Sequence, residues 1–337
     1  MTPIITSLLD TDLYKFTMWQ AMLHRHPQTQ SLYRFVCRTQ TAFPMAELVD
    51  EVRAEIDQLC QLKFRKDELD YLASWRFMKS DFIDFLRIFQ FQRDFIEVRA
   101  DGEHLHIVAS GPQVHVMGFE IFVLSIVNEL YFRRFDQQAA LTEGRRRLAA
   151  KVVRLQELAR EAKHRHPFEL FDFGVRRRFS GAWQREVVQT FATQTAQWFK
   201  GTSNVLLARD LGLVPIGTMA HEYLQSYQAH GVRLRDFQIA ALIGRDAAEQ
   251  DVVVAALDDV NRIDLHVAQM FDGGLRGFGA GTEGLALVEP LGVEPEATSQ
   301  GQWNGERRCA HCTDPVGRVL IILPENAPAP KRTGVSL

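Results

Sequence analysis

The stretch that decides the fold is FKGTSNVLLARDLGLVPIGTMAHEYLQ, at positions 199–225. Within it, apolar segments alternate with short polar turns: GTSN follows the first apolar segment, and GTMAHE follows the second. A helical pattern over 205–211 separates the two turns. Alternation of strand, turn and helix is typical of parallel strands joined by helical crossovers, and it therefore predicts an α/β domain.

The same alternation of strand, turn and helix begins one strand earlier in the chain. Residues 168–173 have the pattern of a short strand, the arginines 176–178 follow it, and a helical pattern occupies 183–198. Three successive strands thus carry polar groups at their carboxyl ends: the arginine cluster, GTSN and GTMAHE. Because ligands of α/β proteins bind at that edge of the sheet, the sequence places a functional site there.

The first third of the chain has a different, mixed pattern. Residues 31–38 alternate polar and apolar side chains as a half-buried strand does, and 95–109 indicates two strands around the turn Asp101-Gly102. Asp10 or Asp12 is expected to cap a helix that begins near Leu13. Further stretches with helical spacing lie at 43–72, 80–89, 119–132 and 137–162. We therefore expect an N-terminal mixed α+β domain over 1–130 and an α/β barrel-like domain over 131–337.

Composition excludes several classes of protein. The chain has 337 residues, of which 46% are hydrophobic and 24% charged, as in ordinary globular proteins of about two domains. The formal net charge of −3 provides no field for nucleic acid or for an anionic membrane, so neither is expected as a partner. Four scattered cysteines do not form a secreted disulfide framework and indicate reduced thiols in the cytoplasm.

Neither a signal peptide nor a membrane span is expected from the sequence. The first sixteen residues lack a basic flank followed by an apolar stretch. The most apolar stretch, 114–132, contains His115, Glu120, Asn128 and Glu129, and so it is predicted to be a buried core helix.

The polar strand ends allow both functional and structural interpretations. GTSN at a strand-to-helix turn suits a phosphate, and the alternative is an ordinary helix cap. The arginines 176–178 can bind a carboxylate or phosphate in bidentate fashion, and the alternative is a solvated loop. His221 follows the third strand, and HEYLQ at 221–225 is not a zinc motif because its fifth residue is Gln225.

Two later motifs are weaker. Residues 279–284 match GxGxxG, but Pro290 and Gly292 interrupt the chain soon afterwards, so a phosphate-wrapping turn fits better than a dinucleotide-binding helix. An oxidoreductase that uses this stretch is the third and weakest interpretation. Cys309 and Cys312 form a CxxC without a second pair, and no metal site is predicted from them.

Four motifs together are distinctive: LLDTDLYKFTM (8–18), DFGVRRRFS (172–180), the stretch at 199–225, and RLRDFQ (233–238). From Ser7 to about Leu242 the chain resembles the nicotinate phosphoribosyltransferase family. The resemblance implies a shortened TIM-like α/β barrel of the type II phosphoribosyltransferase kind. It also implies a ligase-type glycosyltransferase of NAD biosynthesis, which makes nicotinate mononucleotide from nicotinate and phosphoribosyl pyrophosphate (PRPP) with ATP hydrolysis.

The resemblance also implies roles for particular residues. His221 matches the histidine that ATP phosphorylates, and a neutral imidazole is a suitable phosphoryl acceptor near pH 7. The substrate-binding residues that it implies are Tyr14 on the pyridine ring, Thr218 near the carboxylate, Arg176 facing the carboxylate and the phosphates, and Ser203, Gly281 and Thr282 in phosphate turns. ATP and Mg²⁺ are the expected cofactors, with no protein ligand assigned to the metal, and a homodimer is the expected assembly.

The sequence departs from the family beyond Leu242. The RHDSGDP-type motif of the family is missing, and an internal deletion of some dozens of residues between about Leu242 and Asp251 is the simplest account. In the family this motif supplies an arginine and acidic residues to the nicotinate and PRPP pocket. Asp258, Asp259 or Arg276 would have to replace them here. The alternative function is therefore a catalytically impaired relative that binds nucleotide or phosphate, or that pairs with a full-length enzyme. A chain that folds poorly around the deletion is a further alternative.

Overall fold

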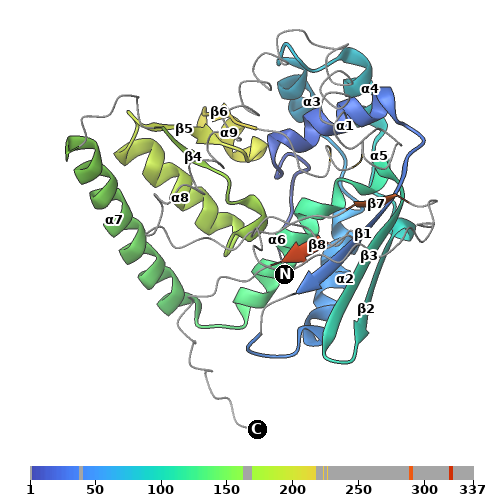
Figure 1. Cartoon of the computed structure of the whole chain (residues 1–337), viewed down its shortest axis with the longest axis horizontal. Helices are drawn as coiled ribbons and strands as arrows, with labels where there is room; N and C mark the ends of the chain where they lie inside the picture. The colour runs from blue at the N-terminus through green and yellow to red at the C-terminus, as the bar shows by residue number, and fades with distance from the viewer. Residues whose placement is uncertain are drawn as a thin grey trace, which may run out of the picture.

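The computed structural model of the chain describes residues 2–37, 41–161, 169–217, 223, 226, 288–290 and 319–321. The described part contains a five-stranded sheet, in the order β2-β3-β1-β7 with β8 also paired with β1, and a three-stranded sheet in the order β4-β5-β6 (Figure 1). The mixed part comes first in the chain and the α/β part second, which confirms the predicted fold class. The domain boundary expected at residue 130 stays a prediction.

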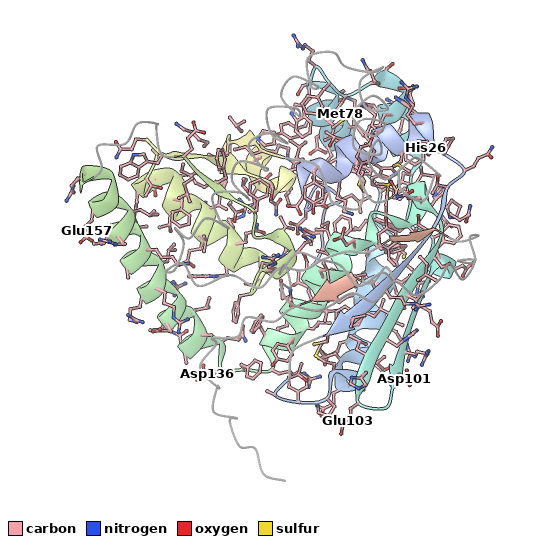
Figure 2. The ribbon with its side chains drawn as sticks, in the orientation of Figure 1. His26, Met78, Asp101, Glu103, Asp136 and Glu157 are labelled. Carbon is pink, nitrogen blue, oxygen red and sulfur yellow. The ribbon has the colours of Figure 1, made fainter. Side chains whose placement is uncertain are left out.

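The first sheet is built around β1 (Gln30–Cys37), where polar and apolar residues alternate as predicted. Its neighbour β3 (His104–Pro112) runs antiparallel to it and forms the expected hairpin with β2 (Ile96–Asp101). Gly102 adopts φ 59° in the turn of this hairpin, and Figure 2 shows Asp101 and Glu103 on either side of it. The short strands β7 (Val288–Pro290) and β8 (Val319–Ile321) also pair with β1.

The long periodic stretch at 43–72 does not form one helix. It divides at residues 60–65, where Cys60 and Leu62 donate backbone hydrogen bonds that close the preceding helix. The helices between residues 13 and 116 are α1 (Leu13–Arg25), η1 (Met45–Leu48), α2 (Val49–Leu59), α3 (Lys66–Ala73), α4 (Ser80–Ile88), η2 (Arg93–Phe95) and α5 (Gln113–Val116).

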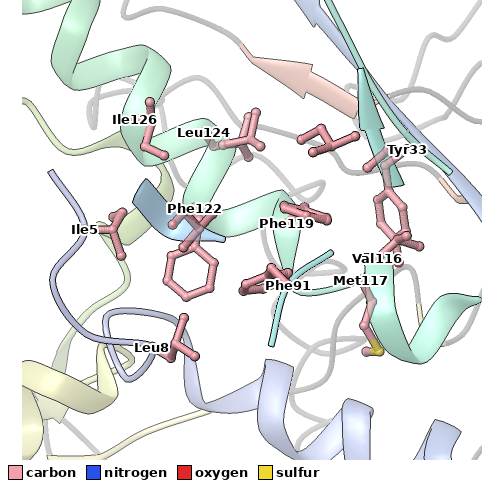
Figure 3. Close-up of a cluster of buried hydrophobic side chains, with 14 of the residues drawn as sticks. Ile5, Leu8, Tyr33, Phe91, Val116, Met117, Phe119, Phe122, Leu124 and Ile126 are labelled. Carbon is pink, nitrogen blue, oxygen red and sulfur yellow. The ribbon is translucent and has the colours of Figure 1, made fainter. Parts of the chain in front are cut away.

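Helix α6 (Phe119–Arg133) lies at the centre of the hydrophobic core, as predicted for the apolar stretch. Figure 3 shows Phe119 and Phe122 of this helix near Leu8 and Phe91, with Ile126 further along the same helix. The helical stretch 113–133 is long and apolar enough to cross a membrane, but 89% of its most apolar window is buried inside the protein. Burial on nearly all sides explains why this helix is apolar without a single polar face.

The α/β part follows α7 (Gln137–Glu161), which packs beside α8 (Figure 1). Its elements are β4 (Leu170–Asp172), η3 (Val175–Arg177), α8 (Gly181–Gln194), β5 (Phe199–Thr202), α9 (Val205–Leu211) and β6 (Val214–Pro215). The three strands are parallel, as the sequence predicts. Asn204 caps α9 by accepting the backbone N–H of Leu207 at 3.1 Å, and Gly212 ends the helix with φ 63°.

Candidate active site

The carboxyl ends of the three parallel strands meet at one edge, as expected from the sequence. Asp172, Thr202 and Pro215 occupy the same level of the sheet, as their pairing shows. The arginine cluster lies in η3 directly after β4, and GTSN directly follows β5. The first two of the three predicted polar strand ends are therefore neighbours in space.

The N-terminal segment 9–13 lies across this edge and closes it. The N–H of Leu13 donates to the carbonyl of Ser203 at 2.8 Å, and the N–H of Val205 donates to the carbonyl of Thr11 at 3.0 Å. An isolated antiparallel bridge joins Asp12 to Asn204. These backbone bonds bring α1, which begins with Leu13 and Tyr14, to the strand ends of the second domain.

Tyr14 and Arg176, both predicted to bind substrate, come together at this edge. The guanidinium carbon of Arg176 lies 5.8 Å from the centre of the Tyr14 ring. The ring itself is buried against Ile121 of α6 and Val175 of η3. The pair supplies an aromatic surface and a planar cation side by side, which suits an aromatic carboxylate.

Gly217 brings the third strand end to the same place. A Cβ atom added at Gly217 would lie 3.0 Å from the side chain of Leu13 and 3.0 Å from the backbone nitrogen of Tyr14. A side chain there would make the neighbouring atoms at the start of α1 shift by a few tenths of an ångström, so glycine favours this close approach of the GTMAHE turn. The first residue of that turn is thus in contact with the segment that carries Tyr14.

Glu120 and Lys15 also lie at this site, although no sequence pattern predicted a role there for either residue. Glu120, in the first turn of α6, accepts from Nη1 of Arg176 at 3.0 Å and forms a short ion pair with Nζ of Lys15. Both Glu120 and Lys15 are almost completely buried. A signal existed in the sequence, since charged residues in an apolar helix are seldom buried without a partner or a purpose.

Arg178 has a different partner from Arg176. Its two terminal nitrogens donate to the two carboxylate oxygens of Asp10, at 2.7 and 2.8 Å, and the amide of Asn204 donates to Asp10 at 2.8 Å. The predicted bidentate carboxylate clamp is therefore present in the cluster, but the carboxylate that Arg178 holds belongs to the chain itself.

Ser203 is fully buried, and its hydroxyl donates to Asp12 at 2.5 Å. The backbone N–H groups of residues 203–207 all donate to acceptors within the protein: Asp172, Thr202, Thr11, Leu9 and Asn204. In this structure the turn binds the N-terminal segment and carries a helix cap. The phosphate contact expected at Ser203 stays a prediction.

Asp12 occupies the position that precedes α1, as expected, but its side chain makes no capping hydrogen bond. It accepts from Ser203 instead. Burial raises the pKa of Asp12, and the nearby guanidinium of Arg176 and the hydrogen bonds of Ser203 and Tyr14 oppose this rise. The field of Arg176 therefore favours the ionised form of this buried carboxyl.

Asp172 is a second buried carboxyl at the edge. It accepts from the hydroxyl of Thr202 at 2.7 Å, from the amide of Gln184 at 3.0 Å and from the backbone N–H of Gly174 at 3.1 Å. Burial raises its pKa, and these three hydrogen bonds work against the rise. The network ties β4, β5 and α8 together beneath the arginine cluster.

The other predicted site residues, Thr218, His221, Gly281 and Thr282, lie outside the described residues, as do Cys309 and Cys312. Among the residues that the structure describes, no group of three or more His, Cys, Asp or Glu side chains is arranged to hold a metal ion.

Two family models match the chain. The nicotinate phosphoribosyltransferase N-terminal domain matches residues 9–128, and the nicotinate phosphoribosyltransferase family model matches residues 168–275. The chain belongs to the nicotinate phosphoribosyltransferase family. The two matched regions include Tyr14, Glu120, Arg176 and Ser203, and also the motif around His221.

Relatives with this name are close in sequence. The chain is 60% identical over 282 residues to a nicotinate phosphoribosyltransferase of Herminiimonas arsenicoxydans, and 51% identical over 283 residues to one of Neisseria meningitidis serogroup A. Each alignment covers 81% of this chain and 70% of the relative. That coverage agrees with a shortened member of the family, and the deletion expected between Leu242 and Asp251 lies outside the described residues.

Solved structures agree in fold. The crystal structure of nicotinate phosphoribosyltransferase from Porphyromonas gingivalis superposes with a TM-score of 0.63 at 31% identity, and that from Vibrio cholerae with 0.61 at 31%. Each match covers 73% of this chain, and 61% and 58% of those chains respectively. The chain thus spans about three fifths of the length of these solved structures.

Proposed function

We propose that this protein joins nicotinate to the phosphoribosyl group of PRPP, forming nicotinate mononucleotide and pyrophosphate for NAD biosynthesis. The observation that carries the proposal is the placement of the Arg176 guanidinium 5.8 Å from the centre of the Tyr14 ring. In the proposal the pyridine ring stacks at the edge of the site where Tyr14 and Arg176 meet, and the guanidinium donates to its carboxylate. Membership of the family supports the same reaction.

The proposal includes coupling to ATP through His221. A phosphoryl group would move from ATP to the imidazole, which is nucleophilic in its neutral form; ADP would leave, and hydrolysis of the phosphohistidine would release phosphate. Such transfer depends on positioning and on neutralisation of charge, which Mg²⁺ supplies when it enters with the phosphates of ATP or PRPP. Gly217 lies against the start of α1, and Thr218 is the next residue in the sequence. We propose that Thr218 contacts the carboxylate. Gly281 and Thr282 are proposed to contact phosphate.

A steady-state assay with nicotinate, PRPP, ATP and Mg²⁺ tests the reaction. We expect nicotinate mononucleotide to form together with ADP, and a chromatographic assay measures both. Labelling with γ-labelled ATP tests the histidine: the wild type should carry acid-labile, base-stable phosphate, and His221→Ala should carry none. Equal labelling of both proteins would exclude His221.

A second function, that of a catalytically impaired relative, is favoured by the missing RHDSGDP-type motif and by the incomplete coverage of relatives. It predicts labelling of His221 with little or no nicotinate mononucleotide, since loss of one contact of about 3 kcal/mol in the transition state slows a reaction about a hundredfold. Turnover like that of a full-length relative would exclude it.

The proposal also includes a homodimer and a cytoplasmic location. Size-exclusion chromatography tests the homodimer, and cell fractionation tests the location.

A further inference from the structure

Lys15, Glu120 and Arg176 form a chain of charges that leads from the core to the candidate active site. The side chains of Lys15 and Glu120 are 2% and 1% exposed, whereas that of Arg176 is 27% exposed. One carboxylate oxygen of Glu120 pairs with Lys15, and the other accepts from Arg176. Arg176 is thus the outer end of a chain whose inner members are hidden from solvent.

The three members come from three different elements. Lys15 follows Tyr14 on α1, Glu120 lies in the first turn of the core helix α6, and Arg176 lies in η3 at the end of β4. The helix that carries Glu120 is the most deeply buried one in the described part, so this carboxylate has a fixed position. A fixed carboxylate that holds a guanidinium restricts where the guanidinium points.

The charges of Lys15, Glu120 and Arg176 explain how Arg176 can bind an anionic ligand. A buried carboxylate needs a compensating charge, and Lys15 supplies one to Glu120 within the core. Arg176 is a second cation on the same carboxylate, so Lys15, Glu120 and Arg176 together carry more positive than negative charge. The exposed side of the Arg176 guanidinium is where an anion can approach this group.

We infer that Glu120, backed by Lys15, is a positioning residue that fixes the Arg176 guanidinium beside the Tyr14 ring, so that the site accepts an aromatic ring bearing one carboxylate. This inference rests on the proposed function and adds to it the residues that set the preference for an anion. Glu120 acts through Arg176 and does not touch the substrate.

A purely structural role for the Lys15–Glu120 pair is the alternative, and it makes a different prediction. Loss of a structural pair lowers the free energy of unfolding and leaves the affinity for nicotinate unchanged. Loss of a positioning group raises the KM for nicotinate, while the KM for PRPP and kcat change little. The split between these constants therefore separates the two roles.

The test uses Glu120→Gln and the double variant Lys15→Met with Glu120→Gln. The single variant leaves Lys15 buried without its counter-ion, which endangers folding, whereas the double variant removes both buried charges and keeps the volume similar. In each folded variant we expect the KM for nicotinate to rise about tenfold or more, the range for loss of a hydrogen bond between charged groups. The KM for PRPP and kcat should stay within about threefold, since neither depends on Arg176 orientation alone.

Glu68→Gln is the matched control. Glu68 is likewise a fully buried carboxylate; it accepts from Ser7 and pairs with Arg65, and neither partner belongs to the chain Lys15–Glu120–Arg176. This variant should lose stability and keep the wild-type KM for nicotinate. An unchanged KM in the double variant as well would overturn the inference.

Equilibrium binding separates failure of the inference from failure of the proposed function. Calorimetric titration with nicotinate and with uncharged nicotinamide needs no turnover. A wild type that binds nicotinate without making product, and a double variant that has lost its preference for nicotinate, would contradict the function and support the inference. A wild type that neither binds nicotinate nor makes product would overturn both.

An Arg176→Gln background completes the design. If Glu120 acts through Arg176, the effect of Glu120→Gln on nicotinate affinity should fall to less than about twofold when Arg176 is already changed, because residues that act as a unit are not additive. If instead the two substitutions weaken nicotinate affinity by independent factors that multiply, Glu120 does not act through Arg176 and the inference is wrong.

Discussion

Arg176 and Arg178 lie two residues apart in one turn, and the structure uses them in opposite ways. Arg178 is 2% exposed and holds Asp10 with both terminal nitrogens, so its donors serve the protein. Arg176 is 27% exposed, lies beside the Tyr14 ring and is oriented by a carboxylate that Lys15 already compensates. The comparison teaches that the partner carboxylate, and not the arginine, decides whether a cation fastens the fold or faces a ligand.

Removal of Arg178 should have the largest effect on stability. Arg178→Met leaves Asp10 in a largely buried position without its cation, and breaking such a pair costs about 3–5 kcal/mol. Urea unfolding followed by circular dichroism measures the loss. Arg176→Met is the matched comparison, and it should cost about 1 kcal/mol or less because Glu120 keeps Lys15. Similar losses for the two variants would break the distinction drawn between the arginines.

A variant in the strands beneath both arginines should have an intermediate effect. A Cβ at Gly201 would lie 2.0 Å from the carbonyl oxygen of Val214, so Gly201→Ala must push β6 away from β5. Overpacking of this kind costs about 1–3 kcal/mol, and a thermal melt measures it. Gly212→Ala is the control: its Cβ meets nothing within 4 Å, and only its φ of 63° opposes the change, at about 1 kcal/mol.

The smallest expected effect concerns Asp12, on which the field of Arg176 acts. Burial raises the pKa of this carboxyl above its ordinary value of 3.8, so the folded state holds the proton more tightly than the unfolded state does. Its ionisation therefore lowers stability as pH rises from the unfolded pKa through the folded one, and the loss is complete above the folded pKa.

Asp12→Asn removes that titration and can still accept from Ser203. The variant should gain stability relative to the wild type as pH rises through this window, and denaturant unfolding across a pH series measures the difference. A difference that stays constant with pH would show that Arg176 and the hydrogen bonds fully offset burial. Arg176 and the hydrogen bonds would then lower the pKa of Asp12 by as much as burial raises it.

Local patterns in the sequence predicted much of the fold. Helix α9 has the bounds expected from its apolar spacing, because Asn204 and Gly212 mark its two ends with side-chain and backbone chemistry. The hairpin at Gly102 and the core helix α6 follow from equally local signals. The break within 43–72 was missed, since apolar spacing continues through it and no proline marks the turn.

The site was only partly predictable, for a physical reason. Tyr14 and Arg176 were recognised by motif, and the structure brings them together. The roles of Lys15 and Glu120 depend on contacts across 105 and 56 residues of chain, and periodicity carries no information about such partners. Ser203 shows the same limit: its turn reads as a phosphate site, yet its hydroxyl meets Asp12, which lies 191 residues away.

The bonds between the segment 9–13 and the residues 203–206 have a consequence for the order of events during synthesis. The N-terminal residues leave the ribosome first, but the segment 9–13 can complete its backbone bonds only after residue 206 has emerged. At about 5–20 residues per second, that delay is roughly 10–40 s. During this time Lys15 and Tyr14 can already meet Glu120 and Ile121 of α6, but the backbone groups of residues 9–13 lack their hydrogen-bond partners at 203–206 and stay exposed to water.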